Sequence, residues 1–523
     1  MKRLWAAVAV LVAITAARIA FVESLHDQGY FAKYLIFADR ILAGDIPRDR
    51  LLDLSPLYLW CTVAFRAIGA GFHAIRAMQI ALVSFAAFFA GLAVRRWGAI
   101  AVSAAAVFIL TSRGALVCAT ELEPETFILL FNSAALAAVM NGAPLTAGLL
   151  LGLSATCRPN ALLAALLLAI VMKSWRVIAG ALIPVVLVLG VNSGLTGEVA
   201  LMDPGTVFYE GMNPNATGYE GVQPRIVNDL ERTSREPDYL HVAYRIVVAG
   251  VVGHPVTRAE SNRYWTSKAF AFTRDYPRAA VILTARKLYF AVHSYEAYDL
   301  ATMVRKDFEL SSWPLFLPFG VLVGLWSAGV LAGRTAGVPP AWTFLFATLL
   351  PMVIFYVTAR QRNAMLPAAA VLAAIGLVEI LRRGQFLTAI TAAVIAIFLS
   401  INGNAQREDS AGWFGWRNLF DQAIALESSG RWMEADVMLQ DLQGYQPMRE
   451  NRAVSSVAYY RARAALHLGR NLRALLAQAE HEAPGNEHVL ALLAVNGDKR
   501  AERRLFELHD PFTARRALLA ARR

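Results

Sequence analysis

The chain has 523 residues, of which 57% are hydrophobic and only 17% are charged. Soluble proteins carry about a quarter charged residues, so this composition excludes an ordinary soluble protein and indicates a membrane protein. The net charge of +11 comes from basic residues spread along the chain, without the basic, aromatic-interleaved run typical of nucleic-acid binding. The cysteines Cys61, Cys118 and Cys157 form no CxxC motif, which argues against a disulfide framework or a zinc site.

Apolar runs follow one another along most of the chain. A membrane helix needs about 20 apolar residues, and runs near that length predict about eleven membrane helices. They cover residues 4–22, 75–94, 98–112, 125–141, 143–157, 160–172, 177–194, 313–333, 341–358, 363–381 and 385–402. The first run has a basic start and ends in small residues, so a cleaved signal peptide is the alternative to a retained first helix.

Basic residues in short loops predict the orientation of these helices, because cytoplasmic loops carry an excess of Lys and Arg. With Met1 in the cytoplasm, the following basic residues also lie inside: Arg95, Arg96, Lys173, Arg176, Arg334, Arg382 and Arg383. The loops 24–74 and 195–312 then face outward, as does the region from about residue 403. We therefore expect a polytopic membrane domain, 1–402, and a soluble domain, 403–523.

Four arginines do not follow this rule, because they fall at short external turns. They are Arg113, Arg158, Arg360 and Arg362. Guanidinium groups match phosphate oxygens well, so cations at these turns suggest a bound anion. The alternative is that they extend to lipid headgroups.

Two acidic stretches are expected on the same external face. In "HDQGYFAKYLIFADRILAG", aromatic and aliphatic residues recur at three- and four-residue spacing, which predicts an amphipathic interfacial helix preceded by Asp27. In "CATELEPETFILLF", Glu121, Glu123 and Glu125 precede a membrane helix. Helix capping explains either stretch, but the shared face also allows one polar pocket.

A third external segment, 203–224, is rich in Gly, Asn, Pro and Tyr, which predicts a structured loop. Its Tyr209, Asn213 and Asn215 carry hydroxyl and amide groups that suit sugar hydroxyls. Ordinary loop packing is the alternative.

The C-terminal residues are polar and contain two similar phrases, "ALESSGRWMEADVML" and "ALHLGRNLRALLAQA", each predicting a helix, a glycine turn and a second helix. Gly430 and Gly469 are about one tetratricopeptide period apart, so we expect a tetratricopeptide-like domain. Such repeats bind peptides or protein partners.

These segments together resemble the multi-spanning glycosyltransferases of the GT-C type, which include protein O-mannosyltransferases and the aminoarabinose transferases of lipid A. The resemblance extends to about residue 400 and is greatest to bacterial members with a tetratricopeptide tail. It rests on "HDQGY", "SPLYLW", "LEPETFILLF", "TCRPNALL", "FYEGMNPNATG", "YWTSKAFAFTRDYPRAAVILTARKLYF" and "RQRNAMLPAAAVLAAIGL".

The resemblance implies an enzyme of the bacterial inner membrane. It would take a sugar from a polyprenyl-phosphate carrier on the extracytoplasmic side and transfer it with inversion. Asp27 corresponds to the general base of that family, although Gln28 stands where many relatives have a second acidic residue. The donor phosphate would be bound by Arg158, Lys287, Arg360 and Arg362. The acceptor or sugar would contact Glu121, Glu123, Tyr209, Asn213 and Asn215. Metal use varies in this superfamily, and the sequence offers no convincing set of metal ligands.

An external C-terminal domain favours a protein or peptide acceptor over a glycolipid, and no nucleic acid is expected. Two other classes stay open. A carrier or flippase of lipid-linked substrates would bind the same phosphate but need no base, and a membrane assembly scaffold would act through its C-terminal domain alone.

Overall fold

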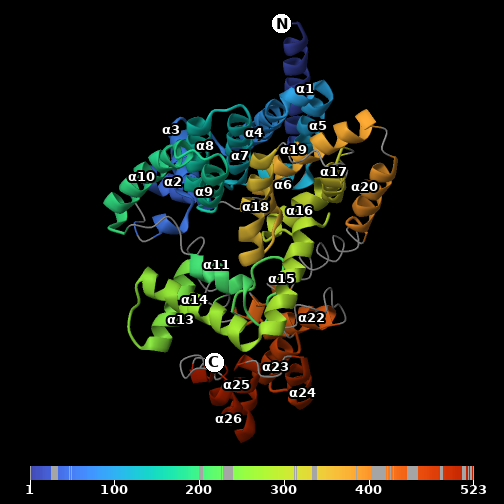
Figure 1. Cartoon of the computed structure of the whole chain (residues 1–523). Coiled ribbons are helices and arrows are strands. Elements are labelled where there is room, and N and C mark those ends of the chain that lie inside the picture. Colours follow the sequence, from blue (N-terminus) through green and yellow to red (C-terminus); the bar gives the residue numbers. More distant parts are fainter. Residues whose placement is uncertain are drawn as a thin grey trace. The chain divides into compact units, whose positions relative to one another are not determined.

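In the computed structural model the chain is built of α-helices (Figure 1). The structure describes residues 2–24, 33–45, 48, 50–198, 204–224, 227, 240–310, 313, 315–331, 338–383, 386–401, parts of 420–443, 457–482, 487–508 and parts of 514–521. Within these residues, the only β-type pairing is an isolated bridge between Tyr219 and Val357. The all-α fold class is thus confirmed.

Before residue 200, eight of the helices are formed mainly by apolar residues. They are α1 (Lys2–Ser24), α4 (Phe72–Ala93), α5 (Ala99–Leu110), α6 (Arg113–Thr120), α7 (Glu125–Met140), α8 (Pro144–Cys157), α9 (Ala161–Val171) and α10 (Arg176–Thr196). The segment between α1 and α4 adds α2 (Lys33–Leu42) and α3 (Pro56–Ala67), with a short 3-10 turn at Leu51–Asp53.

The central segment contains helices of more mixed composition. They are α11 (Pro204–Gly211), α13 (Leu240–Val252), α14 (Arg258–Asp275), α15 (Pro277–Val292) and α16 (Ala301–Glu309). Four apolar helices follow: α17 (Phe319–Leu331), α18 (Pro339–Ile354), α19 (Ala359–Arg383) and α20 (Phe386–Phe398). α19 packs against α5, α6, α7, α17 and α18, so helices far apart in the sequence share one bundle (Figure 1).

Every apolar run that predicts a membrane helix overlaps a helix of the structure. Among the described residues, three helices are long and apolar enough to cross a membrane: Phe72–Ala93, Arg176–Thr196 and Ala359–Arg382. The pair α5 and α6, bent by 48°, makes a fourth if it counts as one span. The shorter apolar helices among the described residues, such as α7, α8 and α18, have 10–17 residues. A 16-residue helix is about 24 Å long, less than the ~30 Å hydrocarbon core, so the count of eleven crossings stays a prediction.

Glycines allow the bundle helices to approach closely. A Cβ on Gly148 of α8 would lie 2.1 Å from the carbonyl oxygen of Val177, and one on Gly180 of α10 would lie 2.4 Å from that of Leu145. Such contacts between small residues hold helices together where water does not drive association. They fix α8, and thereby the segment that follows it, against its neighbours.

Helices α2 and α3 pack against the bundle through a cluster of aromatic and aliphatic side chains. Tyr34 and Phe37 of α2 are buried with Tyr58 of α3, Phe127 of α7 and Cys157 of α8. The expected amphipathic helix is therefore present as α2 and begins at Lys33. This packing brings the start of α2 to the ends of α6 and α8.

The chain separates into two compact units, and the C-terminal helices belong to the second. This unit contains residues 213–217, 222–269 and 405–523, so it includes part of the segment 195–312 as well as the C-terminal tail. Its helices near the C-terminus are α22 (Trp432–Gln443), α23 (Val457–His467), α24 (Arg473–Glu482), α25 (Glu487–Val495) and α26 (Lys499–Leu508). Gly430 and Gly469 lie in turns with φ of +75° and +65°. The tetratricopeptide character and the boundary at residue 403 stay predictions.

Candidate functional site

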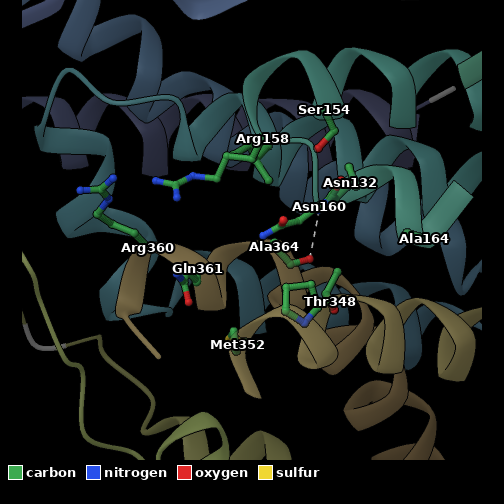
Figure 2. Close-up of a pocket in the computed structure, with 13 residues that line it drawn as sticks. Asn132, Ser154, Arg158, Asn160, Ala164, Thr348, Met352, Arg360, Gln361 and Ala364 are labelled. Carbon is green, nitrogen blue, oxygen red and sulfur yellow. Dashed lines mark hydrogen bonds between the residues drawn. The ribbon is translucent and has the colours of Figure 1, made fainter. Parts of the chain in front are cut away.

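A pocket lies where α7, α8, α9, α18 and α19 meet, and Arg158 and Arg360 form part of its wall (Figure 2). Each of these helices, or the residue directly before it, also contributes one polar side chain to the wall: Asn132, Ser154, Asn160, Thr348 and Gln361. The remaining wall residues are Ile128, Ala161, Ala164, Pro351, Met352 and Ala364. Its cavity volume is about 30 Å³. This space holds one or two water molecules, or one edge of a larger ligand.

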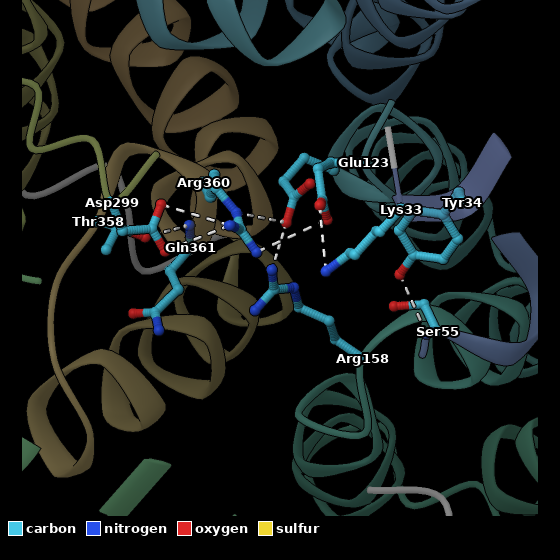
Figure 3. A network of polar contacts seen from close by, with 10 residues as sticks. Lys33, Tyr34, Ser55, Glu123, Arg158, Asp299, Thr358, Arg360 and Gln361 are labelled. Atoms are coloured by element: carbon cyan, nitrogen blue, oxygen red, sulfur yellow. Dashed lines mark hydrogen bonds and ion pairs between the residues drawn. The ribbon is translucent and has the colours of Figure 1, made fainter. Parts of the chain in front are cut away.

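Arg158 and Arg360 also belong to a network of ion pairs, here called the charge cluster, which consists of Lys33, Glu123, Glu125, Arg158, Asp299 and Arg360 (Figure 3). Glu125 Oε1 accepts from Arg158 Nη2 and from Arg360 Nε, the latter at 3.2 Å. Lys33 Nζ lies 3.2 Å from Glu123 Oε1, and Arg360 Nη1 lies 3.3 Å from Asp299 Oδ2. The cluster contains as many cations as carboxylates.

Local structure explains why these side chains meet. Pro124 precedes α7 and makes Glu125 its first residue, Arg158 directly follows α8, and Arg360 is the second residue of α19. Carboxylates are favoured at the positive N-terminal end of a helix, which suits Glu125. Three helix termini thus place their charged side chains at one end of the bundle.

The charge cluster is largely removed from water. The side chains of Glu123 and Glu125 are at most 1% exposed, and that of Arg360 is 12% exposed. Burial raises the pKa of Glu123, while Lys33 and Arg360 oppose this rise. Buried charges persist only when they are paired, so any anion entering this site must exchange with a carboxylate already bound to the guanidinium groups.

Arg362, the fourth arginine expected at the external turns, has a different environment from Arg360. Its Nη2 donates to the carbonyl oxygens of Phe290 (3.0 Å) and Tyr295 (2.7 Å), and its Nη1 lies 3.4 Å from Glu296. Its guanidinium stacks 4.8 Å from the ring centre of Phe319. These contacts anchor the segment that carries Asp299 and leave Arg362 outside the pocket wall.

Arg113 and Lys287 also lie outside the pocket wall. Arg113 pairs with Asp307, which accepts a further hydrogen bond from the Tyr298 hydroxyl. Lys287 Nζ donates to the carbonyl oxygen of Ile354 at 3.2 Å, and burial lowers the pKa of Lys287 from 10.5 to about 7. A lysine that is largely neutral near pH 8 is a weak ligand for phosphate.

The remaining expected site residues are distributed as follows. Glu121 is buried at the end of α6, where its carbonyl oxygen accepts from Gln79 Nε2. Tyr209 is half-buried on α11. Asn213 and Asn215 belong to the second unit, where Asn213 Oδ1 accepts from the Asn215 amide at 2.8 Å. Asp27 lies outside the described residues.

Several polar residues of the site were not expected from the sequence. Lys33 lies within the predicted interfacial helix and Gln361 between Arg360 and Arg362, where no pattern distinguishes either side chain. Asp299 lies in a segment with no recognisable motif, and Asn132 and Ser154 occur in apolar stretches. An isolated polar residue inside an apolar run is the available signal, because such a residue is costly in a membrane helix unless it has a partner. In the described residues, no group of three or more His, Cys, Asp or Glu side chains could hold a metal ion.

Comparison with known proteins finds no matching family, no similar curated protein and no similar solved structure.

Proposed function

We propose that the chain is a membrane glycosyltransferase that transfers a sugar from a polyprenyl-phosphate donor to an extracytoplasmic acceptor. The observation that carries this proposal is the meeting of Arg158 and Arg360 on the shared Glu125, next to a polar pocket at the end of an apolar bundle. Two guanidinium groups close together offer parallel N–H donors that match phosphate oxygens.

In the proposed reaction, a hydroxyl oxygen of the acceptor attacks the anomeric carbon of the donor sugar and the hydroxyl proton passes to Asp27. The bond from the anomeric carbon to the phosphate oxygen breaks, the configuration inverts, and polyprenyl phosphate leaves with its bonding electrons. Arg158 and Arg360 would stabilise the negative charge that develops on the phosphate. The internal carboxylates of the cluster would keep both guanidiniums in place before the donor arrives.

The proposal includes the topology expected from the sequence. It has about eleven membrane crossings in the bacterial inner membrane, with the helix ends that carry the charge cluster on the extracytoplasmic side. A C-terminal domain on the same side favours a protein or peptide acceptor over a glycolipid. Large apolar side chains such as Phe85 on α4 and Leu187 on α10 are exposed, which suits contact with lipid.

The decisive experiment compares Asp27→Asn with Asp45→Asn, a matched change in the same external loop, where Asp45 forms an exposed ion pair with Arg40. Mass spectrometry would follow glycans on extracytoplasmic proteins and lipids in cells that carry each variant. Removal of a general base lowers the rate by about 10²–10⁴-fold, so Asp27→Asn should abolish the glycan and Asp45→Asn should preserve it. Full glycan formation by Asp27→Asn would refute the assigned base, and unchanged glycans in cells without the gene would refute the transferase.

A further inference from the structure

The pocket beside the charge cluster contains polar atoms that have no hydrogen-bond partner within the described residues. They are Asn132 Oδ1, Ser154 Oγ, Arg158 Nε and Gln361 Oε1. Asn132 is 1% exposed and Ser154 is fully buried. Asn132 Nδ2 donates to the Ala364 carbonyl oxygen at 3.1 Å, so reversing the amide would bring two oxygens together, and Oδ1 must face away from it.

Buried polar groups are nearly always hydrogen-bonded, because leaving them without a partner forfeits their interaction with water. Four such atoms around one pocket therefore need an occupant that both donates and accepts hydrogen bonds, which ordered water or a hydroxylated ligand supplies. Oxygen atoms of Asn132 and Gln361 accept, Arg158 Nε donates, and the Ser154 hydroxyl can do either. Neighbouring hydroxyl groups on a sugar ring have this combination of donors and acceptors.

The charged groups of the pocket wall limit which ligands can bind. Among the described residues, its wall includes two guanidinium groups and no carboxylate, because Glu125, which pairs with both, is not a wall residue. A cationic ligand in the pocket would meet guanidinium donors and no carboxylate acceptor, whereas a neutral hydroxylated ligand can use both the donors and the amide acceptors of the wall. The small cavity accepts one edge of a sugar ring rather than the whole ring.

We propose that Asn132, Ser154 and Gln361 bind the hydroxyl groups along one edge of a neutral donor sugar, while Arg158 and Arg360 hold its phosphate. This inference rests on the proposed function and goes further, because it assigns a sugar-binding site and selects neutral over amino-substituted sugars. Each of the three residues comes from a different helix, so the site exists only in the folded bundle (Figure 2).

The test measures binding of three probes to the full-length protein in detergent: undecaprenyl phosphate, its glucose ester, and its 4-amino-4-deoxyarabinose ester. The variant Ser154→Ala/Gln361→Met removes two of the proposed hydrogen-bonding groups and preserves the bond from Asn132 to Ala364. We expect it to bind the glucose ester about tenfold more weakly and undecaprenyl phosphate unchanged, since each lost hydrogen bond weakens binding several-fold. Wild-type protein should prefer the glucose ester over the amino sugar ester.

Ser133→Ala is the matched control, because Ser133 is buried on α7, likewise has no partner for its hydroxyl, and does not line the pocket. It should bind all three probes as the wild type does. The proposed sugar site would be refuted if the double variant bound undecaprenyl phosphate and its glucose ester equally more weakly than the wild type does. It would also be refuted if the wild type bound these two lipids with equal affinity. Neither result would refute phosphate binding by Arg158 and Arg360. If wild type binds none of the probes, the proposed function itself is refuted.

Discussion

Glu125 offers the most direct test of how the charge cluster is built. Its carboxylate is fully buried and its Oε1 accepts from both Arg158 and Arg360. Glu125→Gln keeps the shape of the side chain but removes the negative charge between two guanidinium groups. At 3.2 Å and an effective dielectric constant near 20, one such ion pair corresponds to about 5 kcal/mol of Coulomb energy.

The net loss of stability is smaller than the Coulomb energy of two pairs, because a buried ion pair is partly offset by desolvation. Removing one partner of a buried pair typically costs about 3–5 kcal/mol, and we expect Glu125→Gln to fall in that range. The measurement is the thermal unfolding midpoint of the full-length protein in detergent. Glu434→Gln serves as the control, because Glu434 pairs with Arg431 at an exposed position and should leave the midpoint unchanged.

Phosphate should partly restore the stability of Glu125→Gln. In this variant the two guanidinium groups do not have to release the Glu125 carboxylate before they bind phosphate. Undecaprenyl phosphate should therefore bind to Glu125→Gln at least about tenfold more tightly than to wild type. It should therefore raise the unfolding midpoint of Glu125→Gln more than that of wild type. Equal stabilisation of both proteins by the lipid would refute the view that Glu125 occupies the place of the substrate phosphate.

Three further predictions concern residues outside the pocket wall. Gly148→Ala should disrupt the contact between α8 and α10 and reduce the yield of monodisperse protein in size-exclusion chromatography, whereas Gly190→Ala, with open space around its Cβ position, should not. The unfolding midpoint should rise between pH 7 and pH 10, because burial lowers the pKa of Lys287 to about 7 and the unfolded chain binds its proton more tightly in that window; Lys287→Met should lose this rise. Arg362→Lys should lower the midpoint by several degrees without weakening undecaprenyl phosphate binding, because Arg362 contacts backbone carbonyls, and weakened binding would instead make it a phosphate ligand.

The sequence predicts Arg158 and Arg360 as phosphate ligands, since both stand at turns where the distribution of basic residues disfavours cations, and this role stays a prediction. The same argument selects Arg113 and Arg362 equally. Only the structure separates them, because the orientation of a guanidinium depends on the carbonyl and carboxylate groups that surround it. Contacts with Asp307 and with backbone carbonyls engage Arg113 and Arg362.

Composition and periodicity by themselves determined that the chain is helical and where its apolar helices lie, because an apolar run forms a helix through contacts between residues close in sequence. Tertiary structure alone decided that the six residues of the charge cluster meet around Glu125 and Arg360. These residues lie on separate helices and loops far apart in the sequence, so no local pattern encodes their meeting. Burial then makes the pairing of their charges obligatory.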